Sequence, residues 1–303
     1  TGLAANYTLS GGTHQLTINQ RPLNATLARQ YDGTTTSSGS TLSSFDALQG
    51  GETLTMSGSG TAASVNVANG IAMSSNGDLG LVDGTGLASN YSLNSTVINI
   101  TQRVLNSSGS KIYDANTNAL AADITLSNLV SGETLNHSGT ATLSSANAGS
   151  YTISNLTGIS IADNAGLASN YTLTGGTHNF TVNPKVVSIQ GNKTYDGNTT
   201  ISSSDITSIT GTVGSETLVM SSGTGTTSSQ NAATYASAGI NEGSLTLGNG
   251  SNGGLAANYT LTGHAASSFQ INQRVLSSSG TRTYNGTTTA ASSDLTLSNL
   301  VGS

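Results

Sequence analysis

The sequence predicts an all-β protein, a tandem array of small, Ig-like β-sandwich modules of about 82 residues each. Two observations predict this fold class. Short motifs recur along the chain with a period near 82 residues, and apolar residues alternate with polar ones between Gly- and Ser-rich segments. A parallel β-helix or solenoid is the alternative, because a composition rich in Ser, Thr, Asn and Gly also suits it. Its coils, however, usually repeat every ~20–30 residues.

A tyrosine-led motif marks each repeat, and its tyrosines are 82, 82 and 89 residues apart. The four copies read Tyr31-Asp32-Gly33, Tyr113-Asp114-Ala115, Tyr195-Asp196-Gly197 and Tyr284-Asn285-Gly286. A second landmark, Gly-Leu-Ala-(Ala/Ser)-Asn-Tyr, ends at Tyr7, Tyr91, Tyr171 and Tyr259. A third, Glu-Thr-Leu, begins at Glu52, Glu133 and Glu216. Motifs that return in the same order indicate copies of one structural unit.

The basic residues follow the same period and set the predicted boundaries. All eight fall in four pairs, and the second member of each pair lies two residues before a motif tyrosine. Cutting before each pair gives a C-terminal fragment of a repeat at 1–20, complete repeats at 21–102, 103–184 and 185–273, and an N-terminal fragment at 274–303. Because Thr1 lies inside a repeat, we expect the true N-terminus to lie elsewhere.

Within a repeat, local patterns predict strands. Apolar residues alternate with polar ones at Leu16 and Ile18, at Ile98 and Ile100, and at Phe269 and Ile271. The segment 174–177, Thr-Gly-Gly-Thr, predicts a hairpin turn between two such runs. Segments 119–123 and 43–47 are expected to form single helical turns, and no long helix is expected because Gly and Ser interrupt every candidate.

Composition excludes several classes of protein. Only 7% of the residues are charged and eight are Lys or Arg, too few for a nucleic-acid interface. No apolar run is long enough to span a membrane, so no membrane span is expected in this segment. The chain has no cysteine, which excludes disulfides and thiolate metal sites. The low charge and clear alternation favour folded β-structure over disorder.

The recurring motif residues are candidate site residues, and we interpret them as structural. In Tyr-Asp-Gly, we expect the tyrosine to pack in the core with its hydroxyl bonded, the aspartate to form an Asx-turn and the glycine to have a positive φ. In Asn-Tyr, we expect the asparagine to cap the start of a strand. The alternative for both motifs is sugar recognition. These residues are Tyr31, Asp32, Gly33, Tyr113, Asp114, Tyr195, Asp196, Gly197, Tyr284, Asn285, Asn90, Tyr91, Asn170, Tyr171, Asn258 and Tyr259.

The carboxylates and histidines form no pattern typical of a metal or catalytic site. The acidic residues lack the D-x-D-x-D-G spacing of calcium loops, and the four histidines lack metal-ligand spacing. The recurring Glu133 and Glu216 are expected to pair with the recurring Arg or Lys instead. No nucleophile elbow, phosphate loop or dinucleotide fingerprint occurs. We therefore expect no enzymatic activity and no cofactor.

Taken together, the Tyr-Asp-Gly motif, the Glu-Thr-Leu motif and the closing Asn-Tyr strand resemble the YDG-type repeat of giant bacterial adhesins related to filamentous haemagglutinin. The resemblance covers essentially the whole chain, and it departs from the pattern at Ala115, Asn285 and Ser215. It implies an extracellular location on the bacterial surface or in secreted matrix. It also implies export by two-partner or related secretion, and no enzymatic activity.

Three functions fit these observations. The chain is expected to be a stalk or spacer of a surface adhesin, acting in cell adhesion or biofilm. The alternatives are a self-assembling extracellular filament or sheath subunit, and a set of carbohydrate-binding modules. The expected partners are neighbouring repeats of the same chain. Further partners would be other copies, in fibres, and a host or matrix glycan at a tip outside this segment.

Overall fold

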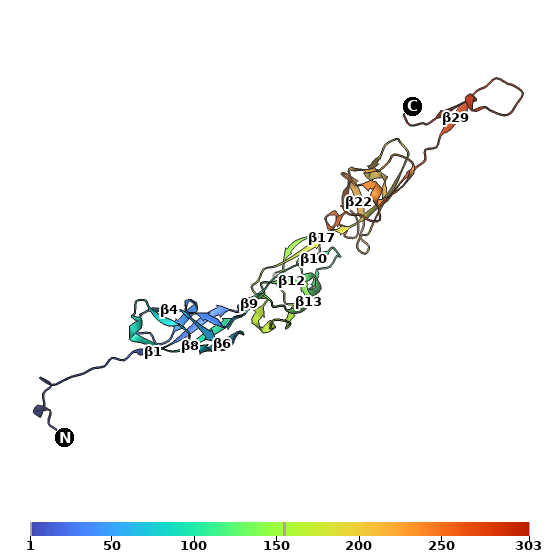
Figure 1. The fold of residues 1–303 in the computed structure, drawn as a ribbon. Helices are drawn as coiled ribbons and strands as arrows, with labels where there is room; N and C mark the ends of the chain where they lie inside the picture. Colours follow the sequence, from blue (N-terminus) through green and yellow to red (C-terminus); the bar gives the residue numbers. More distant parts are fainter. Residues whose placement is uncertain (1, 154–155, 303) are drawn as a thin grey trace. The chain divides into compact units, whose positions relative to one another are not determined.

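The computed structural model describes residues 2–153 and 156–302. The described chain consists of β-strands and 3-10 helices of three residues each, which Figure 1 draws in chain order. It divides into two compact units. The first comprises Thr1–Asn106, Leu126–His137 and Ser160–Gly176, and the second comprises Ser107–Thr125, Ser138–Ile159 and Thr177–Ser303.

The elements of the first predicted repeat are β1 (Arg21–Gln30), β2 (Thr36–Ser38), η2 (Gly39–Thr41), β3 (Leu42–Phe45), β4 (Leu54–Ser57), β5 (Ser59–Ala62), β6 (Ala68–Ser75), β7 (Gly80–Asp83), η3 (Ala88–Asn90) and β8 (Tyr91–Thr101). Those of the second are β9 (Arg103–Val104), β10 (Asn106–Ile112), β11 (Asn118–Leu120), η4 (Ala121–Asp123), β12 (Ile124–Ser127), β13 (Asn136–Thr142), β14 (Gly149–Thr152), β15 (Ile159–Ala162), η5 (Ala168–Asn170), β16 (Tyr171–Thr172) and β17 (His178–Asn183).

The elements of the third predicted repeat are β18 (Lys185–Val186), β19 (Ser188–Thr194), β20 (Thr200–Ser202), η6 (Ser203–Asp205), β21 (Ile206–Thr210), β22 (Leu218–Ser222), β23 (Thr224–Thr227), β24 (Ala233–Ala236), η7 (Ser237–Gly239), β25 (Ile240–Asn241), β26 (Thr246–Asn249), η8 (Ala256–Asn258), β27 (Tyr259–Thr260) and β28 (Ser268–Asn272). The terminal fragments contain η1 (Ala4–Asn6), β29 (Ser277–Gly280), η9 (Ser292–Asp294) and β30 (Leu295–Ser298).

In the first unit, six strands form one sheet in the order β2-β5-β6-β8-β1-β3, and β4 pairs with β7. Alternate residues of β1, Leu23, Ala25 and Leu27, point inward and are buried. The main core cluster joins Leu27 of the large sheet to Met56 of the small one, so apolar side chains fill the space between the two sheets. The second and third predicted repeats contain smaller sheets, β12-β10-β17-β14 and β11-β13-β15 in the second and β21-β19-β28-β24, β20-β23-β25 and β22-β26 in the third.

Each repeat pairs its first long strand with its last in parallel. Strands β1 and β8 pair in this way from Arg21 opposite Tyr91 to Gln30 opposite Thr101. The pairs β10–β17 and β19–β28 have the same direction. Other pairs in the large sheets are antiparallel, for example β1–β3, β6–β8, β14–β17 and β19–β21. The predicted all-β array of repeated modules is confirmed. The strand order does not return in parallel coils, as a β-helix would require.

The copies differ in side-chain size at one pair of facing positions in the parallel strands. Leu27 lies opposite Ile98 in the first repeat, whereas Gly109 lies opposite Phe180 in the second. A Cβ at Gly109 would lie 2.8 Å from the Phe180 ring and 2.4 Å from the Asp123 carbonyl oxygen. The glycine therefore makes room for the larger aromatic ring of its partner.

Three local predictions are wrong. The segment 174–177 is not a hairpin turn, because β16 pairs in parallel with β9 and β17 pairs in parallel with β10. It interrupts what is one continuous strand, β8, in the first repeat. Residues 43–47 are not a helical turn, since Leu42–Phe45 is strand β3, although 121–123 does form one. Leu16 and Ile18 lie outside any strand and are 88% and 87% exposed, because no described strand pairs with them.

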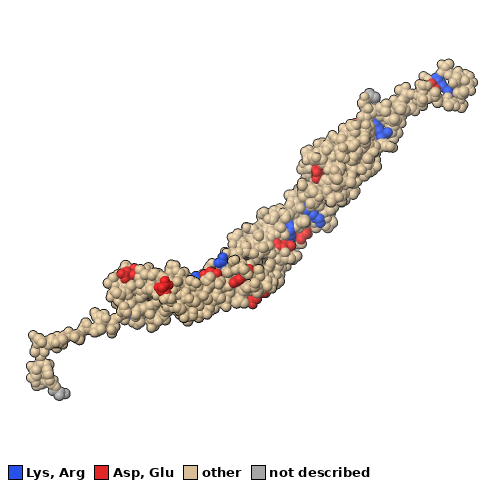
Figure 2. Space-filling model, in the orientation of Figure 1, with Lys and Arg blue, Asp and Glu red and all other residues tan. Residues whose placement is uncertain are grey.

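The surface carries few charges. The face drawn in Figure 2 is mostly uncharged, and several of its Lys and Arg side chains lie beside Asp and Glu. In the part of the chain that the structure describes, no helix is long and apolar enough to cross a membrane.

Candidate functional site

The recurring tyrosines, glutamates and asparagines meet where one repeat contacts the next. In the first unit, the Tyr31 hydroxyl of repeat 1 donates a hydrogen bond to Glu133 Oε1 of repeat 2 at 2.5 Å. The Tyr171 hydroxyl donates to the other oxygen of the same carboxylate, Oε2, at 2.6 Å. The two rings are edge to face with centroids 5.4 Å apart. One glutamate therefore joins two buried phenols from different repeats.

The asparagine before the second tyrosine completes this first joint. Asn170 Oδ1 accepts from the backbone N–H of Val67 at 2.9 Å, and Asn170 Nδ2 donates to Asn66 Oδ1 at 3.0 Å. Asn170 is 1% exposed, so these bonds satisfy a buried amide. The Val130 N–H also donates to the Tyr171 hydroxyl, at 3.1 Å. Tyr31, Glu133, Asn170 and Tyr171 form the first joint.

The second unit contains the same arrangement between repeats 2 and 3. Tyr113 donates to Glu216 Oε1 at 2.7 Å and Tyr259 donates to Glu216 Oε2 at 2.6 Å. Their rings are also edge to face, with centroids 5.3 Å apart. Asn258 Oδ1 accepts from the Ala148 N–H at 2.8 Å and its Nδ2 donates to Asn147 at 3.1 Å. Tyr113, Glu216, Asn258 and Tyr259 form the second joint.

The joints keep their tyrosines protonated. Burial, the hydrogen bond to Glu216 and the negative charge of Glu216 together raise the pKa of Tyr113 and of Tyr259 to about 12. Burial and Glu133 raise the pKa of Tyr171 to about 12, and they raise the pKa of Tyr31 as well. Each phenol is thus held in its donor form beside a carboxylate.

A largely buried cation organises the loop that follows each of the motif tyrosines Tyr31, Tyr113 and Tyr195. Lys111 Nζ lies 2.8 Å from Asp114 and donates to the Asn116 carbonyl at 2.8 Å. Lys193 Nζ contacts Asp196 and donates to the carbonyls of Asn198 and Thr200 at 2.9 and 2.7 Å. The corresponding side chain in repeat 1, Arg29, contacts Asp32 and is 10% exposed. The backbone of the loop wraps around the positive charge.

The charges of these loops shift the acidic pKa values. Burial acts to raise the pKa of Asp114 and Asp196, but hydrogen bonds from Lys111 and Lys193 and from nearby backbone N–H groups outweigh it. The net effect is a pKa below the usual value for both carboxyls. Both aspartates are therefore ionised partners of their lysines at neutral pH.

The YDG-domain family model matches three consecutive parts of the chain, residues 13–98, 99–179 and 177–268. The chain belongs to the YDG-domain family. No curated protein and no solved structure matches it.

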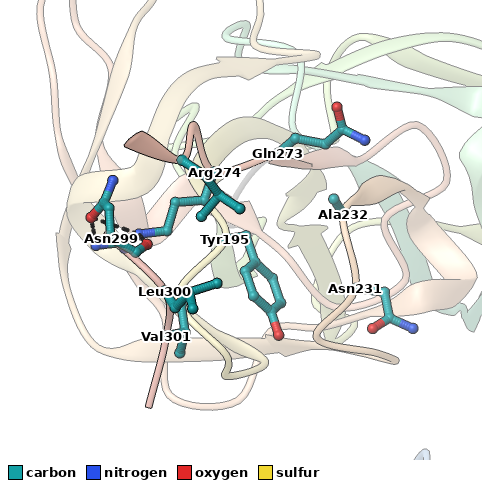
Figure 3. A pocket seen from close by; sticks show the side chains of 9 residues that line it. Tyr195, Asn231, Ala232, Gln273, Arg274, Asn299, Leu300 and Val301 are labelled. Atoms are coloured by element: carbon teal, nitrogen blue, oxygen red, sulfur yellow. Dashed lines mark hydrogen bonds between the residues drawn. The ribbon is translucent and has the colours of Figure 1, made fainter. Parts of the chain in front are cut away.

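The structure places the YDG motif residues at the edge of each joint. Tyr31 and Tyr113 are 4% exposed, while Asp32 Oδ1 accepts from the Thr34 N–H at 2.9 Å as an Asx-turn does. Gly33, Gly197 and Gly286 have φ near 77°, and Ala115 has φ 62°. Tyr195 is half-buried beside a hollow that Figure 3 shows, and Tyr284 is 90% exposed in a fragment with only two strands. Asn285 accepts from the Thr287 N–H at 3.2 Å.

Two interpretations of the recurring Asn and Glu residues need correction. Asn170 and Asn258 do not cap their own strands, because their side chains bond the preceding repeat. Asn90, which has no such neighbour, is exposed. Glu133 and Glu216 contact tyrosines, whereas the pairing of Lys111 and Lys193 is with the YDG aspartates. The expected pairing of these glutamates with the recurring Arg or Lys is therefore wrong.

Sequence reasoning also missed Asn66 and Asn147, whose side chains accept hydrogen bonds from Asn170 and Asn258 of the following repeat. They lie in the Asn- and Ala-rich stretches of the repeats, and their recurrence was the available signal. Within residues 2–153 and 156–302, no three His, Asp or Glu side chains are grouped so that they could hold a metal ion. The recurring Tyr, Glu and Asn side chains join one YDG module to the next.

Proposed function

We propose that this chain is a run of structural spacer repeats from a secreted bacterial surface adhesin, without enzymatic activity, that acts in adhesion or biofilm. The observation that carries the proposal is the repeated joint. The YDG tyrosine of one repeat and the Glu, Asn and Tyr of the next are used to connect modules, in the same geometry twice.

The burial of the tyrosines supports a spacer over a carbohydrate-binding module. A sugar platform needs exposed aromatic rings, yet Tyr31, Tyr91, Tyr113, Tyr171 and Tyr259 are all at most 5% exposed. The most exposed tyrosines, Tyr7 and Tyr284, lie in the terminal fragments. Location on the bacterial surface follows from the resemblance to adhesin repeats and is part of the same proposal.

Surface location is tested first. Antibodies raised against this chain should label intact, unpermeabilised cells of the source organism or the matrix around them. Labelling that requires permeabilisation would overturn the proposed location.

The spacer role is tested by varying length. The chain is placed between a surface anchor and an independent binding head on capsulated bacteria. Removing residues 103–184 should lower adhesion while leaving the affinity of the isolated head unchanged, because a joint between Tyr31 and Glu216 can re-form. As the matched control, an unrelated β-sandwich of equal length in place of this repeat should restore adhesion. Adhesion by the chain without any head would show instead that the repeats bind a ligand directly.

A further inference from the structure

The lysine loop of the second repeat holds an amine, a carboxylate and an amide in mutual contact. Lys111 Nζ lies 2.8 Å from Asp114 Oδ1 and donates a hydrogen bond to Asn116 Oδ1 at 2.9 Å. Asn116 Nδ2 in turn donates to Asp114 Oδ2 at 2.7 Å. The carboxylate therefore bridges the lysine nitrogen and the amide nitrogen of the asparagine, with one oxygen on each.

The Asn116 amide is also placed to be attacked. The Asn118 backbone N–H donates to Asn116 Oδ1 at 2.8 Å, so a fixed donor can stabilise the negative charge that develops on this oxygen when a nucleophile adds to Cγ. The Lys111 side chain is 7% exposed, which leaves little water around its nitrogen. Asp114 is 44% exposed, so a small leaving group beside it can escape into solvent.

The sequence pairs the lysine of this loop with the asparagine. Two copies of the loop have lysine followed by asparagine five residues later, and the other two have arginine followed by threonine. The four pairs are Lys111 and Asn116, Lys193 and Asn198, Arg29 and Thr34, and Arg282 and Thr287. A cation alone does not explain this pairing, because arginine and lysine both contact the loop aspartate. A side chain that can become a nucleophilic amine is present only where an amide faces it.

We propose that Lys111 Nζ forms an amide bond with Asn116 Cγ, with Asp114 carrying the protons and ammonia as the leaving group. Asp114 Oδ1 takes one proton from the lysine ammonium, and the freed amine adds to Cγ to give a tetrahedral carbon. Asp114 Oδ2 delivers that proton to Nδ2, the Cγ–Nδ2 bond breaks, and ammonia leaves. The second proton released by Nζ passes through the same carboxylate to the ammonia. Overall, an ammonium and a primary amide become a secondary amide and an ammonium ion.

The assignment is made for the second repeat alone. In the corresponding loop of the third repeat, both oxygens of Asp196 lie on the lysine, at 3.0 and 3.2 Å from Lys193 Nζ. Lys193 Nζ also donates to the Thr200 carbonyl at 2.7 Å, which holds it further in place as a cation. Lys193 therefore serves as a comparison within the same chain.

The bond would close a ring around the second YDG motif. Tyr113 lies between Lys111 and Asn116, and its hydroxyl donates to Glu216 in the second joint. The crosslink would thus fix the loop that presents this tyrosine to the third repeat. The reaction occurs once on the chain's own side chains, without turnover, and the proposal does not rest on the adhesin assignment.

Mass spectrometry of the folded, full chain tests the proposal after incubation at mildly alkaline pH. Trypsin should no longer cut after Lys111, and the peptide that contains Lys111 and Asn116 should be lighter than its sequence by one ammonia. Lys111→Arg with Asn116→Thr copies the pair of the first repeat, so it should fold and show neither change. Asp114→Ala keeps both reacting groups but removes the proton carrier, and it should also retain the ammonia. Lys193→Arg is the matched control and should still lose ammonia at Lys111.

The site of the loss distinguishes this reaction from succinimide formation, which also releases ammonia at Asn-Gly pairs. A succinimide leaves tryptic cleavage after Lys111 intact and opens again in alkaline solution, whereas the proposed amide blocks cleavage and persists. A peptide of full mass with normal cleavage after Lys111 would overturn the proposal. A crosslink between Lys111 and Asn116 that still forms in Asp114→Ala would overturn the role of the carboxylate.

Discussion

At the scale of single residues, the YDG motif works through backbone conformation as much as through its side chains. The residue after the aspartate has a positive φ in every copy, and only the second copy has a Cβ there, at Ala115. In the first copy, a Cβ at Gly33 would lie 2.6 Å from Val130 Cγ1 of the next repeat. This position therefore combines a left-handed conformation with a close contact across the joint.

Ala115→Gly should stabilise the protein. A residue with a Cβ costs ~1–2 kcal/mol in the left-handed region, so replacing Ala115 by glycine removes this strain. The greater freedom of glycine in the unfolded chain offsets part of the stabilisation. We expect the free energy of unfolding in urea to rise by about 1 kcal/mol. The converse change, Gly33→Ala, should lower it by about 2 kcal/mol, because it adds both strain and the contact with Val130. Changes of equal size in the free energy of unfolding for the two substitutions would contradict the added contact with Val130.

At the scale of elements, a joint connects two segments of one repeat to two segments of the next. Its central group is a carboxylate that accepts from two buried phenols, and hydrogen bonds to charged acceptors are the stronger kind. The loop itself is held by a cation that its own backbone surrounds. A mutation in the joint should therefore leave the loop folded, and a mutation of the loop cation should leave the joint formed.

Glu133→Ala should destabilise the first joint by about 3 kcal/mol, because it leaves two buried hydroxyls without an acceptor. Hydrogen exchange read by mass spectrometry should show faster exchange around Tyr31 and Tyr171, with little change at the second joint. Glu52→Ala, which removes the acceptor of one tyrosine only, is the matched control and should have the smaller effect. If Glu52→Ala lowers the stability more than Glu133→Ala does, the number of bonded tyrosines does not determine the effect.

Lys193→Met should destabilise the third repeat by about 2 kcal/mol. Lys193 is 8% exposed, and its loss leaves Asp196 and the carbonyls of Asn198 and Thr200 without their donor. Lys193→Arg should be tolerated, because Arg29 occupies the same place in the first repeat. Urea unfolding of both variants measures the difference. A Met variant as stable as the wild type would show that the cation is dispensable.

At the scale of the whole molecule, the raised pKa values of the joint tyrosines predict that the protein loses stability at alkaline pH. Their folded pKa, about 12 for Tyr113, Tyr171 and Tyr259, lies above the ordinary 10.0, so the folded state holds protons that the unfolded state releases. The stabilisation is complete below pH 10 and is lost as the pH rises through 12. In absorbance titration at 295 nm, Tyr113, Tyr171 and Tyr259 should ionise only together with unfolding. Ionisation of these three tyrosines near pH 10 in the folded protein would contradict this prediction.

The fold was largely predictable from the sequence, whereas the joints were not. The period and the alternation at Ile98 and Ile100 indicated tandem β-modules, because both can be found without knowing which segments contact each other. The partner of Tyr31 was ambiguous for a physical reason. In a repeat protein, Glu52 and Glu133 are equivalent by pattern, and only folding shows that Tyr31 bonds the glutamate 102 residues away. The interruption at 174–177 resembled a hairpin because Gly-Gly marks both a turn and a break in a strand.

The parallel pairing of β1 and β8 has a mechanical consequence. The chain enters this module at Arg21 and leaves it after Thr101, at opposite ends of one pair of parallel strands, whose register shifts once, between Leu23 and Asn24. Tension applied through the chain would pull the two strands past each other along their length. The evenly spaced hydrogen bonds between them would then resist in shear, all at once, instead of opening one by one as in an unzipped hairpin. A module built in this way is suited to withstand pulling, and its lifetime under force would be set by its unfolding rate rather than by its equilibrium stability.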